Sequence, residues 1–232
     1  MGDRVELTDC VPREGGLLAA DGSLTAGLLP LADYLRVPDL FERLGRFGIA
    51  VRGRARSVTL FSRKPIRQLD GAVIAVTEET STTFLLLRLL LEQRYRIAPA
   101  EYRRGQHPDA DALLLIGDEA LRFQRTNTQY PFETDLAFEW WLWQHLPCVF
   151  AVWAIRKDAE PEEKKRLERA LGQSLARNTA QLDAVAAERS DELGIPAADL
   201  AAYLSAFLYR LGPTEEDGIK RFQALVDEHH LL

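Results

Sequence analysis

The sequence contains few of the residues that bind metals or form disulfides. It has two cysteines and four histidines in 232 residues. Cys10 and Cys148 lie far apart with no CxxC spacing, and the histidines show no spacing typical of metal ligands. The glycine-rich fingerprints of dinucleotide and nucleotide phosphate binding are also missing. We therefore predict no metal site, no disulfide framework and no cofactor.

The 29 lysine and arginine residues are outnumbered by 35 acidic residues, and long hydrophobic runs are scarce. The net charge is -6 and the pI is near 5.4. Affinity for nucleic acids or acidic membranes comes mostly from clustered lysine and arginine, so such partners are not expected, although a local basic pocket remains compatible with this composition. No run reaches the length of a membrane span, and the sequence MGDRVELTDC has no apolar leader. These features predict a cytoplasmic protein that does not bind membranes.

The chain is long and apolar enough to bury a large core. Its hydrophobic content is 47%, which suits either one large α/β domain or two lobes of roughly 100 residues each. Segments with strand and helix patterns alternate, and this order predicts mostly parallel sheets covered by helices on both faces. Ligands of such sheets bind beyond the carboxyl ends of the strands. Three junctions after predicted strands therefore become candidates for one cleft: Leu29-Pro30, 77–83 and Gly117-Asp118.

The stretch from Gly71 to Tyr95 contains an unusual cluster of hydroxyls. Val73 to Val76 is predicted to be a buried strand, and Phe84 to Gln93 a helix. Between these two segments lie threonine and serine residues, next to the unpaired N–H groups of a helix start: Thr77, Thr80, Ser81, Thr82 and Thr83. Backbone donors, hydroxyls and the helix dipole together can hold an anion. The alternative is that one hydroxyl caps the helix and the others are solvated.

Gly117-Asp118 forms a second strand-to-helix junction of the same kind. It separates a predicted strand at 110–116 from a predicted helix at 119–124. An aspartate at this point is favoured as an N-cap, which already explains its presence without a catalytic role. Asp118 is therefore predicted to cap the helix and to line the same cleft.

Several segments, in order and spacing, resemble the motifs of chorismate dehydratases, the first enzymes of the futalosine route to menaquinone. The matching segments are SVTLFSRKPI, ETSTTFLL, LLLIGDEAL, LPCVFAVWAIRKD and FLYRLGPTEEDGIKRFQALV. The resemblance extends over roughly Pro12 to Leu232. It implies an α/β fold like that of the type II periplasmic binding proteins, with two lobes and a ligand cleft between them. The implied first lobe comprises residues 1–65 and 150–232, and the second comprises residues 66–149.

The resemblance also implies an activity. A chorismate dehydratase is a carbon-oxygen lyase that converts chorismate, a dicarboxylate, into 3-enolpyruvylbenzoate and water. Aromatisation makes this elimination strongly downhill, so the protein must mainly hold two anions, exclude water and assist one proton transfer. The expected partner is a small anionic substrate. The protein is expected to be a monomer or a homodimer.

Site residues follow from the matched positions. Ser57 matches the serine of this family at the mouth of the cleft, which implies a catalytic or substrate-contacting hydroxyl. Without the resemblance, Ser57 is equally well an edge hydroxyl with no role. The loop residues Thr80, Ser81, Thr82 and Thr83, with Gly117 and Asp118, are predicted to bind the substrate.

One departure from the family leaves other functions open. Chorismate dehydratases normally begin with a further strand and an asparagine-containing loop, upstream of the part that matches Arg4 to Pro12. Here the sequence starts at the second strand, so we expect either a truncated start or a degenerate relative. The alternatives to a chorismate dehydratase are a non-catalytic binder of a small carboxylate and the sister dihydroxynaphthoate synthase.

Overall fold

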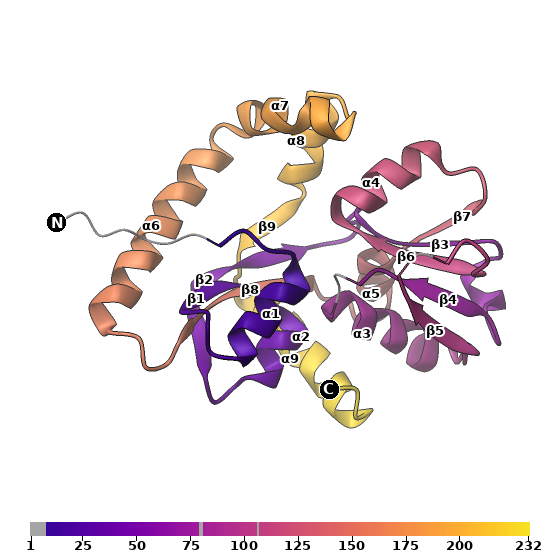
Figure 1. Cartoon of the computed structure of the whole chain (residues 1–232), viewed down its shortest axis with the longest axis horizontal. Helices are drawn as coiled ribbons and strands as arrows, with labels where there is room; N and C mark the ends of the chain where they lie inside the picture. Colours follow the sequence, from indigo (N-terminus) through magenta and orange to yellow (C-terminus); the bar gives the residue numbers. More distant parts are fainter. Residues whose placement is uncertain (1–7, 79–80, 106) are drawn as a thin grey trace.

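The computed structural model describes residues 8–78, 81–105 and 107–232. In this part of the chain, strands form two separate sheets, and helices pack around each sheet to give two lobes (Figure 1). Thr80 and the start of the segment Arg4 to Pro12 lie outside the described residues.

The first sheet combines strands from both halves of the sequence. Its strand order is β1-β8-β2-β9. The strands are β1 (Ala26–Pro30), β2 (Phe41–Val51), β8 (Cys148–Arg156) and β9 (Phe207–Arg210). The sequence of β8, CVFAVWAIR, is rich in the β-branched and aromatic residues that favour strands. This strand is paired on both edges, which explains its apolar composition.

The second sheet has the strand order β5-β4-β6-β3-β7. Its strands are β3 (Val58–Ser62), β4 (Val73–Val76), β5 (Glu101–Arg104), β6 (Ala112–Ile116) and β7 (Phe132–Asp135). Alternate residues of β3 and β6 face opposite sides, as the period of a strand requires. Leu60 and Leu114 belong to the main core, whereas Phe61 and Leu115 belong to a smaller cluster on the α4 side.

Helices cover both sheets and extend beyond them. The helices are α1 (Pro12–Ala20), α2 (Leu31–Arg36), α3 (Thr82–Arg88), α4 (Gly117–Thr126), α5 (Leu136–Gln144), α6 (Pro161–Thr179), α7 (Leu182–Leu193), α8 (Ala197–Ser205) and α9 (Pro213–Glu228). A 3₁₀ turn spans Ile66–Gln68, and a π-helix at Leu89–Tyr95 continues α3. We call residues 161–205 the C-terminal arm, because α6 leaves the first lobe and α7 and α8 reach across to α4 (Figure 1).

The prediction of mostly parallel sheets is wrong. Within the described residues, β4 pairs in parallel with β5 and with β6, and the other strand pairs are antiparallel. The connection between the lobes explains the antiparallel pair at the centre of the first sheet. The chain leaves the first lobe along β2 and returns along β8, so these neighbouring strands run in opposite directions.

The passages between the two sheets are short. β3 pairs with β6 and β7 in the second sheet, although the predicted division at residue 65 assigned it to the first lobe. The first passage therefore lies at residues 52–57, and the second at residues 145–147. Arg56 and His145 have the positive φ angles of 64° and 55° in these passages. Non-glycine residues adopt this conformation at a cost of about 1–3 kcal/mol, so the surrounding structure must hold them there.

Buried contacts fix both passages. The Asp135 carboxylate accepts hydrogen bonds from the Arg56 N–H at 2.7 Å and from the Phe138 N–H at 3.0 Å, and thereby caps α5 as well. Trp140 donates from its indole N–H to the Pro147 carbonyl at 3.2 Å. A continuous core that includes Leu31 and Leu86 joins the lobes beside these passages. The lobes are thus packed together on this side of the molecule.

Within the described part of the chain, no helix is both long and apolar enough to cross a membrane.

The contact between α9 and the second passage gives a testable expectation. A Cβ atom at Gly218 would lie 2.5 Å from the Pro147 carbonyl oxygen. In a helix interior, alanine is more stable than glycine by roughly 1 kcal/mol. The overlap with Pro147 outweighs this gain, so we expect Gly218→Ala to lower the free energy of unfolding by about 1–3 kcal/mol. Urea denaturation measures the change.

Gly172→Ala in α6 is the matched control. Its Cβ would meet only the Arg210 guanidinium at 3.3 Å and the Phe47 ring at 3.7 Å, and both side chains can move. We expect this variant to be neutral or more stable. Equal destabilisation of both variants would contradict the close approach of α9 to Pro147.

Candidate functional site

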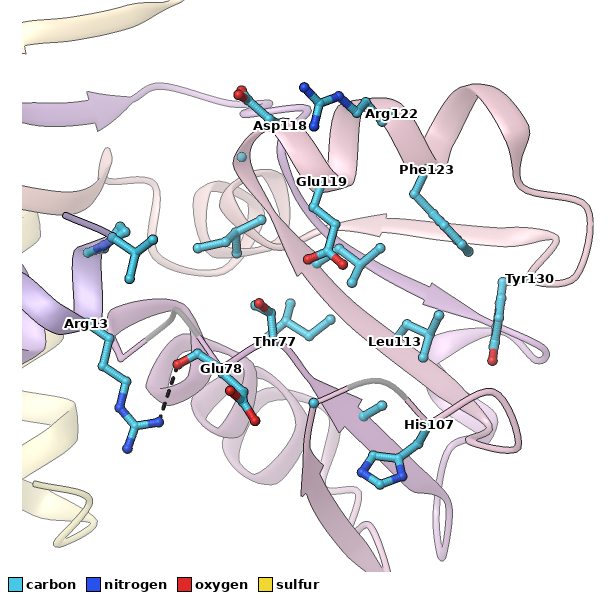
Figure 2. A pocket seen from close by; sticks show the side chains of 18 of the residues that line it. Arg13, Thr77, Glu78, His107, Leu113, Asp118, Glu119, Arg122, Phe123 and Tyr130 are labelled. Atoms are coloured by element: carbon cyan, nitrogen blue, oxygen red, sulfur yellow. Dashed lines mark hydrogen bonds between the residues drawn. The ribbon is translucent and has the colours of Figure 1, made fainter. Parts of the chain in front are cut away.

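A large cavity lies between α1 of the first lobe and the second lobe. Its volume is about 1180 Å³. Figure 2 shows Arg13 on one side, facing Thr77 and Glu78 at the end of β4, with Asp118 and Glu119 at the start of α4 above them. We call this space the first cavity. Strand ends and a helix start meet there, as expected for a ligand site of an α/β sheet.

Local structure positions the part of the first cavity's wall that contains Gly117. Gly117 has a φ angle of 56°, which glycine adopts without strain, and it begins α4 directly after β6. Its N–H donates to the Ser57 carbonyl at 2.8 Å, while the Thr77 N–H donates to the Leu114 carbonyl at 3.1 Å. These bonds hold the ends of β4 and β6 beside the first passage.

Asp118 is not the N-cap that the sequence predicts. The N-cap of α4 is Ile116, which makes no side-chain cap. Asp118 lies in the first turn, where a carboxylate still interacts favourably with the helix dipole. Its side chain pairs with Arg189 of α7 at 3.4 Å.

Ser57 lies behind this wall. It is 3% exposed, and its Oγ accepts a hydrogen bond from the Tyr203 hydroxyl at 2.8 Å. Burial, with a smaller contribution from the Asp118 carboxylate, raises the pKa of Tyr203, although the bond to Ser57 opposes this rise. Tyr203 therefore stays protonated at neutral pH and can act as the donor. The structure thus places Ser57 next to Gly117, although Ser57 itself does not line the first cavity.

The C-terminal arm completes this cluster. Leu121 of α4 packs with Ala186 of α7 and Leu200 of α8, and Tyr203 borders the same cluster. Arg122 of α4 also donates to the Glu192 carbonyl at 3.3 Å. The sequence contains no signal for this docking, so Tyr203 and Arg189 were missed.

The hydroxyls of the loop before α3 serve a different contact. Ser81 Oγ donates to the Asp33 carboxylate at 2.6 Å, and Thr82 Oγ1 accepts from the Ala32 N–H at 3.0 Å. Both partners belong to α2 of the first lobe, so these hydroxyls join the lobes. Thr83 is buried and makes no side-chain hydrogen bond to other described residues. Ser57, Thr82 and Thr83 line neither of the two cavities described here.

A smaller second cavity, of about 370 Å³, adjoins the first. Ser81 lines it, together with Asp33 and several arginines, and the two cavities share Arg13 and Leu17. Among the residues that the structure describes, no group of three or more His, Cys, Asp or Glu side chains is placed to hold a metal ion.

Two α/β lobes with cavities between them are typical of substrate-binding proteins, and solved structures with such a fold resemble this chain. A protein from Archaeoglobus fulgidus matches with a TM-score of 0.75 and 19% identity, over 97% of this chain and 86% of its own. The aliphatic sulphonate binding protein SsuA from Escherichia coli matches with a TM-score of 0.57 and 15% identity, over 95% and 79%. These likenesses confirm the predicted two-lobed fold.

Comparison of the sequence identifies the family more narrowly than the fold does. Residues 2–228 match the family model described as menaquinone biosynthesis. The chain is also 32% identical to the chorismate dehydratase of Thermus thermophilus over 229 residues, which cover 91% of this chain and 83% of that relative. This chain belongs to the menaquinone biosynthesis family.

The contact of Thr82 with α2 can be tested directly. Thr82→Val keeps the shape of the side chain but leaves the buried Ala32 N–H without its acceptor. We expect the free energy of unfolding to fall by about 1–3 kcal/mol, the usual cost of an unsatisfied buried donor. Denaturant titration measures the change.

Thr83→Val is the control, because its hydroxyl has no such partner among the described residues. We expect it to change stability by less than about 1 kcal/mol. If Thr82→Val were as stable as the wild type yet bound ligand more weakly, the hydroxyl would serve the ligand rather than the lobe contact.

Proposed function

We propose that this chain is a chorismate dehydratase, a carbon-oxygen lyase that forms 3-enolpyruvylbenzoate and water in the futalosine route to menaquinone. The observation that carries the proposal is the 32% identity to the Thermus thermophilus chorismate dehydratase across 91% of this chain. The first cavity is the proposed site of the reaction. It lies between the lobes, and chain segments from both lobes line it.

The reaction requires little from the protein. One C–H proton is removed from the ring, one C–O bond breaks, and the hydroxyl leaves as water, so the two electrons of the C–H bond complete the aromatic ring. No electrons enter or leave, and aromatisation drives the elimination. The protein must orient the ring, accept or relay the proton and donate to the leaving hydroxyl.

Ser57 is the proposed catalytic hydroxyl. Tyr203 donates to its Oγ, which leaves the Ser57 proton available for the leaving hydroxyl of the substrate. Tyr203 is therefore a positioning residue in this proposal. Ser57 lies behind Gly117, so its contact with a ligand in the first cavity requires a small separation of α4 from the arm.

The wall around Gly117 and Asp118 is the proposed contact for the substrate ring and its hydroxyl. Gly117 and Asp118 line the first cavity beside Thr77, and Glu119 follows in the same turn. Asp118 and Glu119 carry carboxylates, which suit a hydroxyl or a departing proton better than they suit an anion. Thr80, in the neighbouring loop, remains a proposed contact on the basis of the resemblance.

The activity assay tests the whole proposal. Purified protein incubated with chorismate, without added metal or cofactor, should form 3-enolpyruvylbenzoate, and liquid chromatography with mass spectrometry detects the loss of one water. Chorismate binding without turnover, measured by calorimetry on the same preparation, would instead support the non-catalytic binder.

Ser57 and Tyr203 should differ in their effects. We expect Ser57→Ala to lower kcat by roughly 100-fold or more, as for loss of a group that assists proton transfer. Tyr203→Phe removes only the donor to Ser57, and we expect kcat to fall about tenfold with little change in KM. Tyr209→Phe, whose hydroxyl donates to the Leu204 carbonyl in the same region, is the control. An equal loss in both tyrosine variants would show a structural role for Tyr203.

A further inference from the structure

The second cavity gathers arginines from both lobes. Arg13 reaches it from α1, Arg36 from the end of α2, Arg88 from α3 and Arg104 from the end of β5. Asp33 is the carboxylate in the lining that faces them. The formal charge of the lining is therefore strongly positive, in a protein whose net charge is -6.

Arg88 already pairs with Glu92, through Nε at 2.8 Å and Nη2 at 3.3 Å, whereas Arg13 and Arg36 retain donors for a ligand. Arg36 donates through Nη1 to Asp33 at 2.7 Å, and Arg13 donates through Nη1 to the Glu78 carbonyl at 3.3 Å. A guanidinium carries five N–H groups, so both side chains keep donors for a ligand. Both carboxylate oxygens of Asp33 already accept a hydrogen bond, one from Arg36 and the other from Ser81 at 2.6 Å.

Arg104 lies in an environment that disfavours its charge. Its guanidinium stacks over Phe84 at 4.6 Å from the ring centroid and donates to the Thr77 carbonyl at 3.2 Å. Partial burial lowers its pKa, and the positive charges of Arg13 and Arg36 lower it further, against the opposing effect of Glu78. An anion among these guanidinium groups would relieve their repulsion.

The first cavity has the opposite balance of charge. Four carboxylates are part of its lining, from Glu14, Glu78, Asp118 and Glu119, against Arg13 and Arg122. A dicarboxylate is therefore poorly matched to the middle of that cavity. The linings of the two cavities share Arg13 and Leu17, so a ligand that reaches past these side chains would enter both spaces.

We propose that the second cavity is an oxyanion subsite that receives a carboxylate of the ligand bound in the first cavity, held by guanidinium groups from both lobes. The identity of that ligand rests on the proposed function, whereas the subsite itself does not. Because Arg13 and Arg36 belong to the first lobe and Arg88 and Arg104 to the second, an anion there links the lobes.

The experiment uses malonate as the probe and the full chain as the protein. Malonate affinity is measured by calorimetry at constant ionic strength for the wild type and for Arg104→Gln. We expect the substitution to weaken malonate binding about tenfold or more, as for loss of a charge-assisted hydrogen bond to a carboxylate. Chorismate should compete with malonate in the wild type.

Arg103→Gln is the matched control. It removes the same charge from the adjacent position of β5, but Arg103 pairs with Glu101 and Asp109 and does not line the second cavity. Arg36→Gln, on the other lobe, repeats the test should Arg104→Gln fold poorly, since Asp33 retains the Ser81 donor. Thermal unfolding of each variant verifies folding.

The outcomes separate this proposal from the proposed function. Weaker malonate binding in Arg104→Gln but not in Arg103→Gln, with chorismate competing, supports the subsite even if chorismate is not turned over. Equal binding in the two variants, or no malonate binding by the wild type, overturns it. Malonate binding that chorismate does not displace overturns the assignment to the substrate and identifies a separate small-anion site.

Discussion

The two-lobed structure depends on the buried carboxylate of Asp135. One of its oxygens accepts the N–H of Arg56, which has a left-handed conformation in the first passage, and the other caps α5 through Phe138. The same residue ends β7, which pairs with β3 immediately after that passage. A single side chain therefore fixes the direction in which the chain enters the second lobe. Hydrogen bonds to a buried charge are among the stronger ones in proteins, at about 1.5–3 kcal/mol each.

This entry geometry determines where ligands can bind. The passages and the shared core that includes Leu31 and Leu86 occupy one side of the lobe boundary. The remaining boundary runs past α1, the ends of β4 and β6, and the start of α4, and both cavities lie along it. Its two parts differ in charge, since carboxylates gather in the first cavity and guanidinium groups in the second. The site is therefore polarised along its length, which favours a ligand with separate anionic and hydroxyl-bearing ends.

Local patterns in the sequence predicted the elements better than their contacts. The strand at Val73–Val76 was predicted with its observed bounds, because a short β-branched run between turn residues is distinctive. In the segment after Pro196, by contrast, α8 ends at Ser205 and β9 follows it, because pairing with β2 outweighs local preference. The loop hydroxyls were noticed, but no pattern shows that Ser81 and Thr82 face α2, since that contact joins residues about 50 positions apart. Tyr203 and Ser57 are 146 positions apart, beyond any local signal.

The two contacts that join the lobes differ in strength. The core beside the passages buries large side chains completely, Trp140 and Leu86 among them, and each such side chain contributes roughly 1.5–3 kcal/mol. The arm meets α4 through a smaller cluster and through ion pairs such as Arg189 with Asp118, whose side chains are 53% and 48% exposed. Exposed ion pairs contribute about 0–1 kcal/mol each. Separating the arm from α4 would therefore cost less than separating the lobes at the passages, and the Ser57 hydroxyl, which is bonded to Tyr203 of the arm, lies at this weaker contact.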